Sequence, residues 1–228
     1  NTLTGASAAN TNQLTANAPY AISLKWSDPL GGAATDYDLF LMDAGLTDVY
    51  DYSINIQATT LEPFEIMGFG YAGEKIVVVR WSGPPKALRL DTNRGELTYA
   101  TAGAVVGHNG GESTISVAAT DGLIPEPGDL FVGGAANPVE PYSSDGPRRI
   151  FYEPDGSPIT PGNVLFGTGG GQDLQKPDIT AADCVTTTTP GFISFCGTSA
   201  AAPHAGAIAA LLLSASPTPT PALVRAAM

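Results

Sequence analysis

A turn that leads into a long uncharged segment is the strongest constraint on the fold of this chain. Residues 195–213 read FCGTSAAAPHAGAIAALLL. Gly197 has no side chain and allows close approach of another segment, while Thr198 or Ser199 can cap a helix by accepting from its first free N–H groups. The run 205–213 is apolar on all sides, which is typical of a helix buried in the middle of a domain. We therefore predict a core helix that begins at Ser199.

Ser199 stands at the start of this predicted helix, where the backbone itself offers chemistry. The N–H groups of a first helical turn lack partners, and the helix dipole makes this end positive. Such donors could hold a developing oxyanion beside the Ser199 hydroxyl. A serine that only caps a core helix is the plain alternative.

Three further residues affect what we expect of this helix. Pro203 cannot donate to the carbonyl of Ser199, so we expect the helix to be loosened or bent there. The stretch from Ser199 to Ser214 also holds His204 and Gly206, and it is shorter than the roughly 20 apolar residues of a membrane span. We therefore expect no membrane partner.

The string GTSAAAPHAGAIAAL, which starts at Gly197, closely resembles the serine motif of the subtilisin-like serine peptidases, or subtilases. In that motif GTS is followed by small residues, then PH, then a small-residue helix. The resemblance implies that Ser199 is the nucleophile and that Gly197 and Thr198 form the turn beside the oxyanion. It also implies that His204 is a structural histidine of the same helix and not the catalytic base.

Three upstream segments resemble other subtilase motifs, in the order that the family requires. KPDITAAD (176–183) resembles the KPDI(V/T)AP strand, although Ala182 and Asp183 stand where the family usually has Pro and Gly. YSSDGPRR (142–149) resembles the FSS-x-GP turn, and STISVAATD (113–121) resembles the core strand. We therefore predict an α/β fold in which 98–228 is the C-terminal part of a subtilisin-like parallel-sheet domain.

A serine nucleophile needs a base to take its proton and an acid to orient that base. The sequence has two histidines; besides His204, His108 lies in GHNGGES and reads as a loop histidine ahead of a strand. No aspartate stands in a DTG or DSG context. We therefore expect the catalytic Asp and His in an upstream part of the same chain, of which Asn1–Met228 would be a segment.

The oxyanion asparagine of the family usually follows a buried strand in an AAGN-like turn. Asn10 has no apolar strand before it, and Asn137 comes after the ISVAA strand, in the wrong order. We expect this residue to lie upstream as well.

The front of the chain, residues 1–97, has a different pattern. Apolar residues alternate with polar ones in short runs that are separated by turn residues such as DPLGG, DAG and TNRG, which predicts an antiparallel sheet with one buried face. The clearest runs are YAISLKW (20–26), DYDLFLM (36–42) and KIVVVRW (75–81). The W-x-DP-x-GG…DYDL(F/Y)L pattern looks like β-sandwich modules of some bacterial secreted peptidases. We therefore predict a β-sandwich, jelly-roll-like insert ahead of the peptidase part.

Calcium is a possible ligand of this insert. Asp28, Asp36 and Asp38 could supply the oxygen ligands that calcium prefers. Aspartates at turns and strand starts more often satisfy local backbone donors, which is the competing interpretation. The peptidase chemistry itself requires no cofactor.

The charge of the chain excludes one class of partner. Ten basic and 22 acidic residues give a net charge of −12, which repels phosphate backbones, so we expect no nucleic-acid partner. The glycine-rich GTGGGQ at 167–172 lacks the lysine and helix of a phosphate loop and reads as a flexible connector.

Cys184 and Cys196 are 12 positions apart and flank the segment that leads to Ser199. A disulfide between them would contribute about 3 kcal/mol in the chain-entropy model and restrain the serine turn. Two buried free thiols or half of a metal site are the alternatives, although zinc needs further Cys or His ligands. A disulfide favours an oxidising compartment, so we expect a secreted, extracellular protein.

Two functions from different classes follow from this sequence. The first is that of a secreted subtilisin-like serine endopeptidase, which hydrolyses polypeptides through an acyl-enzyme on Ser199. The second is that of a non-catalytic binding or adhesion sandwich fused to an inactive peptidase remnant.

Overall fold

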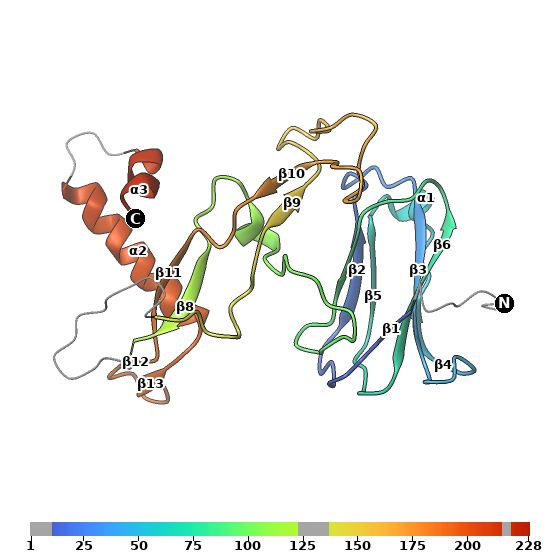
Figure 1. The fold of residues 1–228 in the computed structure, drawn as a ribbon, viewed down its shortest axis with the longest axis horizontal. Helices are drawn as coiled ribbons and strands as arrows, with labels where there is room; N and C mark the ends of the chain where they lie inside the picture. Colours follow the sequence, from blue (N-terminus) through green and yellow to red (C-terminus); the bar gives the residue numbers. More distant parts are fainter. Residues whose placement is uncertain (1–10, 123–136, 216–219) are drawn as a thin grey trace. The chain divides into compact units, whose positions relative to one another are not determined.

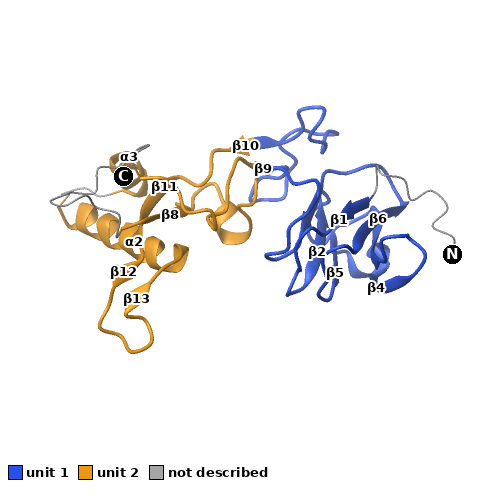
Figure 2. Cartoon of the chain, turned by 60° about the horizontal axis from the view of Figure 1, so that its bottom comes forward, with its two compact units in different colours: residues 1–101, 150–172 blue, residues 102–149, 173–228 orange. Residues whose placement is uncertain are grey.

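The computed structural model describes residues 11–122, 137–215 and 220–228. The chain forms two compact units, one of residues 1–101 and 150–172 and the other of residues 102–149 and 173–228 (Figure 2). These units differ from the predicted domains, 1–97 and 98–228, because the first unit also takes in residues 150–172. The chain passes from the first unit to the second after residue 101. It returns to the first unit inside the short strand β9 (Arg148–Ile150) and enters the second unit again inside the short strand β10 (Gln172–Leu174).

The first unit holds two antiparallel sheets. One has the strand order β1-β6-β3-β4, and the other has the order β5-β2-β7. A single short helix, α1 (Gln57–Thr60), is described in this unit. The strands are β1 (Thr11–Gln13), β2 (Ile22–Trp26), β3 (Asp36–Met42), β4 (Val49–Ser53), β5 (Phe64–Met67), β6 (Lys75–Ser82) and β7 (Leu88–Asp91). The three runs predicted as strands thus correspond to β2, β3 and β6.

Alternation along β2 and β3 builds the core of this unit. Successive side chains of a strand point to opposite faces, and Ile22, Leu24 and Trp26 of β2 are all buried. They pack in one cluster with residues of β3, β5 and β6, so the two sheets share a core. The β6 run is buried only in its first half, and Trp81 is 63% exposed, because the strand continues past that core.

The second unit is built on a parallel strand pair. β8 (Val117–Asp121) pairs with β11 (Ile179–Asp183) in register from Val117 opposite Ile179 to Asp121 opposite Asp183. Helix α2 (Thr198–Ala215) lies beside this pair (Figure 1). It packs there through Ala201 and Ala205, which contact small residues of both strands. A parallel pair covered by a helix is the arrangement of α/β folds, and it is compatible with a subtilase-like domain.

The remaining elements of this unit are short. They are the 3-10 helix η1 (Gly107–Gly110), the hairpin strands β12 (Val185–Thr186) and β13 (Ser194–Phe195), and α3 (Pro221–Ala227). Thr220 caps α3, since its hydroxyl accepts from the N–H of Leu223 at 3.2 Å.

Helix α2 corrects the prediction of a helix buried on all sides. Its buried residues are Ala200, Ala201 and Ala205, whereas Ile208 and Leu211 are 50% and 68% exposed. Only one face meets β8 and β11, and two strands are too few to cover the rest. The 18 residues of α2 also form a helix long and apolar enough to cross a membrane, although a core helix meets the same criterion.

Candidate active site

The turn ahead of α2 is made by Gly197. Its φ of +117° lies in a region that side-chain-bearing residues rarely adopt, so glycine is required here. Its carbonyl accepts from the N–H groups of Ala200 at 2.8 Å and Ala201 at 3.2 Å. The helix begins at Thr198, one residue earlier than predicted, so Thr198 and Ser199 lie inside the first turn and Gly197 takes the capping position instead.

Ser199 is exposed on the first turn of α2. No described residue forms a hydrogen bond with its hydroxyl. The N-terminus of an 18-residue helix is a region of positive potential, where backbone N–H groups can stabilise an anion. A serine in this place can add to an amide carbon once a base removes its proton.

Neither histidine forms a hydrogen bond with Ser199. His204 lies in α2 with its Nδ1 at 2.9 Å from the carbonyl oxygen of Ala182 in β11, so it ties the helix to the sheet. His108 lies in η1, which precedes β8 in the sequence. Asn137 lies just after a break in the described residues, and Asn10 lies outside them. Within the described part of the chain, no base forms a hydrogen bond with the serine hydroxyl.

The most informative neighbour of the turn is Asp183, which the sequence marked only as a departure from a motif. It ends β11, is 0% exposed, and its Oδ2 accepts from the N–H of Gly197 at 2.6 Å. Its other oxygen, Oδ1, is buried without a hydrogen-bond partner in the described structure. A buried carboxylate therefore holds the residue from which α2 starts.

Tyr142 completes this contact by donating its hydroxyl to the same Oδ2 of Asp183. Its side chain is 51% exposed overall, but the hydroxyl is directed to the buried carboxylate. Burial, followed by this hydrogen bond, raises the pKa of Tyr142 to about 12. The phenol therefore stays protonated at neutral pH and remains a donor.

A disulfide joins Cys184 to Cys196, as predicted. The bridge stands at the base of the β12–β13 hairpin, directly beside the hydrogen bond from Gly197 to Asp183. The two ends of the hairpin are thus linked twice, once by the disulfide and once by the hydrogen bond from Gly197 to Asp183. With both sulfurs bridged, free thiols and a cysteine metal site are excluded.

The predicted calcium candidates lie in the first unit. Asp28 accepts from Trp26 Nε1 and from the N–H groups of Ala34 and Thr35, and its Oδ1 pairs with Lys86 Nζ at 2.5 Å. A lysine thus already neutralises this carboxylate. The described residues contain no group of three or more His, Cys, Asp or Glu side chains that could hold a metal.

Asp36 and Asp38, the other two candidates, lie in β3, and Asp36 Oδ1 is buried without a partner in the described structure. Calcium binding stays a prediction.

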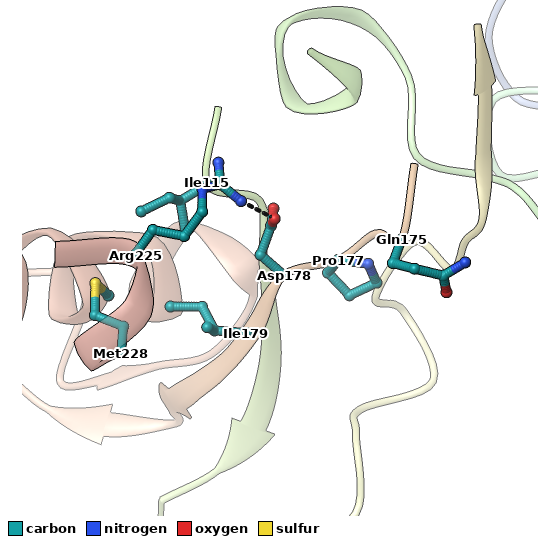
Figure 3. A pocket seen from close by; sticks show the side chains of 7 residues that line it. All are labelled: Ile115, Gln175, Pro177, Asp178, Ile179, Arg225 and Met228. Atoms are coloured by element: carbon teal, nitrogen blue, oxygen red, sulfur yellow. Dashed lines mark hydrogen bonds and ion pairs between the residues drawn. The ribbon is translucent and has the colours of Figure 1, made fainter. Parts of the chain in front are cut away.

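An open pocket of about 370 Å³ lies at the opposite end of β11 from Asp183 (Figure 3). Arg225 pairs with Asp178 at this pocket, and Lys176 Nζ lies 2.7 Å from the same carboxylate. Burial by itself would raise the pKa of Asp178, but the hydrogen bonds from Lys176, the Ser116 N–H and Arg225 lower it below its usual range. Since β11 has five residues, about 13 Å of strand separates this pocket from the serine turn.

Comparisons with known proteins agree with the serine motif. The model of the subtilase family matches residues 46–228, more than half of the chain. No curated protein and no solved structure matches the chain. The family match includes the parallel pair, the disulfide hairpin and the Gly-Thr-Ser turn, and it supports a serine peptidase that acts on polypeptides. The chain therefore belongs to the subtilase family.

Proposed function

We propose that this chain carries the nucleophile of a secreted subtilisin-like serine endopeptidase. Ser199 Oγ attacks the carbonyl carbon of a peptide bond as its proton passes to a base, and the amine leaves to give an acyl-enzyme that water hydrolyses. The observation that carries the proposal is that Ser199 is an exposed residue on the first turn of an 18-residue helix, in a chain of the subtilase family.

The helix start supplies the second requirement, a place for negative charge. The carbonyl oxygen of the substrate becomes an oxyanion when the hydroxyl adds, and donors fixed in advance stabilise it best. The N–H of Ser199 stands at the positive end of α2, behind a glycine turn that the disulfide and Asp183 restrain. These features support Gly197 and Thr198 as the turn beside the oxyanion.

The base and the acid come, in this proposal, from an upstream part of the same polypeptide. Neither a DTG-like nor an HGT-like motif occurs in the sequence, and neither histidine forms a hydrogen bond with Ser199. The apolar face of α2 that its own unit leaves exposed, with Ile208 and Leu211, is a surface that such an upstream part would cover.

The first unit is, in the same proposal, a β-sandwich module attached to the peptidase part. Its two antiparallel sheets and shared core support this interpretation. A disulfide in the peptidase part supports an oxidising compartment and secretion.

The test is substitution of Ser199 in the full-length protein. Ser199→Ala removes one exposed hydroxyl, so we expect peptide hydrolysis to fall to background, with an unchanged midpoint of thermal unfolding. Ser214→Ala, at the other end of α2, is the matched control and should keep full activity. An active Ser199→Ala protein contradicts the proposal, and a full-length protein inactive on every peptide favours the alternative of a binding module on a peptidase remnant.

A further inference from the structure

We propose that Asp183 is a positioning residue for the Ser199 nucleophile. Its buried carboxylate fixes the peptide N–H of Gly197 and thereby the start of α2. This inference rests on the proposed function, because a side chain can position a nucleophile only if Ser199 is one.

The path from the carboxylate to the serine is short. Asp183 Oδ2 accepts from the Gly197 N–H at 2.6 Å, which is a short hydrogen bond. The carbonyl of the same glycine accepts from Ala200 and Ala201. Gly197 thus connects the end of β11 to the first turn of α2. Ser199 lies in the sequence between Gly197 and the two alanines that donate to its carbonyl.

The glycine makes this restraint necessary. Gly197 has no side chain to limit its backbone, so a turn at φ +117° has many alternatives of similar energy. The disulfide between Cys184 and Cys196 fixes where the preceding residues lie, but it leaves the plane of the Gly197 peptide free. A hydrogen bond to that N–H fixes the plane.

The burial of Asp183 argues for a role beyond stability. Aspartate is almost never fully buried unless it is paired, and Asp183 is 0% exposed with Oδ1 unpartnered in the described structure. An unsatisfied buried oxygen destabilises the fold, which is the cost expected of a group kept for function.

Tyr142 fixes the carboxylate in turn, because its hydroxyl donates to the same oxygen that holds Gly197. Tyr142 and Asp183 stand where the subtilase motifs quoted above have Phe and Gly. The phenol oxygen and the carboxylate that it contacts are therefore both absent from those motifs. In this chain the two groups together hold the N–H of Gly197.

The contact itself is tested by amide hydrogen exchange of Gly197, measured by NMR on this chain. Asp183→Ala should accelerate exchange of the Gly197 N–H about 10-fold or more, and Asp183→Asn by less, because an amide oxygen still accepts. Asp145→Asn is the matched control, since Asp145 accepts from the N–H groups of Gly103 and Ala104 and should leave Gly197 unchanged. Unaltered exchange of Gly197 in Asp183→Ala overturns the proposal.

The consequence for catalysis is tested in the full-length protein with a peptide substrate. Asp183→Ala should lower kcat about 10-fold or more with KM within about 2-fold, because the residue touches the turn and not the substrate. Asp183→Asn should recover part of kcat, and Tyr142→Phe should lower it by a smaller factor. If Asp183→Ala does not fold, Asp183→Asn and Tyr142→Phe carry the test, and wild-type kcat in both overturns the proposal.

Failure here is distinguishable from failure of the proposed function. If the Ser199→Ala protein is active, Ser199 is not the nucleophile, and Asp183 then has no nucleophile to position. An inactive Ser199→Ala protein beside fully active Asp183 variants overturns the role of Asp183 alone.

Discussion

Single glycine residues determine the backbone conformation at positions where two segments of the chain lie close together. Gly197 is required for its φ of +117°, whereas Gly146 is required for space. A Cβ built on Gly146 would lie 1.8 Å from the backbone oxygen of Lys176, so two segments of the second unit come close together where a glycine leaves room. Backbone atoms cannot swing aside as a flexible side chain can, and a larger residue must displace one segment.

Gly146→Ala should therefore lower the free energy of unfolding by about 1–3 kcal/mol or more, measured by urea denaturation. Gly206→Ala is the matched control, because Gly206 lies in α2 where an added Cβ would meet no atom within 4 Å, and alanine favours a helix by about 1 kcal/mol. Opposite signs are expected for the two variants. A Gly146→Ala protein as stable as the wild type would contradict the close approach.

At the scale of the elements, neighbouring strands bring acidic side chains close enough to change one another's pKa. In the first unit, β3 brings Asp36 and Asp38 near Glu65 of β5, and Glu65 is 0% exposed. Burial, followed by the charges of Asp36 and Glu65, raises the pKa of Asp38 to about 6 from its ordinary 3.8. Because the folded pKa lies above the unfolded one, the stabilising contribution is fully present below pH 3.8 and is lost as the pH rises through about 6.

Asp38→Asn should mimic the protonated acid, so it should raise the midpoint of thermal unfolding at pH 7 and leave it unchanged near pH 3.5. Calorimetry of both proteins across this range is the measurement. Asp43→Asn is a control of opposite sign, since the backbone N–H of Asp48 and further donors lower the pKa of Asp43. A midpoint difference between Asp38→Asn and wild type that does not vary with pH would show that Asp38 does not titrate in this range.

At the scale of the whole molecule, no residue that the structure describes forms a hydrogen bond with the hydroxyl of Ser199 that could activate it. Ser199 lies on an exposed helix start, His204 is engaged with Ala182, and His108 lies in η1. A hydroxyl with no adjacent base is a weak nucleophile at neutral pH.

The purified chain should therefore hydrolyse no peptide above background, and a fluorophosphonate probe should leave Ser199 unlabelled. Intact-mass spectrometry after incubation with the probe is the measurement, with a known serine peptidase as the positive control. Stoichiometric labelling of Ser199 would mean that a base within this chain reaches the serine.

Much of this fold could be predicted from local sequence patterns. The alternation in β2 and β3 and the Gly-Thr-Ser lead into α2 are properties of consecutive residues, so the sequence predicted the strands, the serine turn and the cysteine bridge. The helix starts one residue earlier than predicted, because its first intrahelical hydrogen bonds, from the N–H groups of Ala200 and Ala201, go to the carbonyl of Gly197.

The rest depended on residues distant in sequence. Asp183 contacts Gly197 across 14 positions and Tyr142 across 41, and no spacing rule links such residues before the strands and turns are placed. The same holds for the exposed face of α2, since burial depends on how many strands a helix meets and not on its own hydropathy. The sequence by itself determined the elements and the nucleophile candidate, because both follow from neighbouring residues. Tertiary structure alone decided which carboxylate holds the turn, because that contact exists only after β11 and α2 have packed.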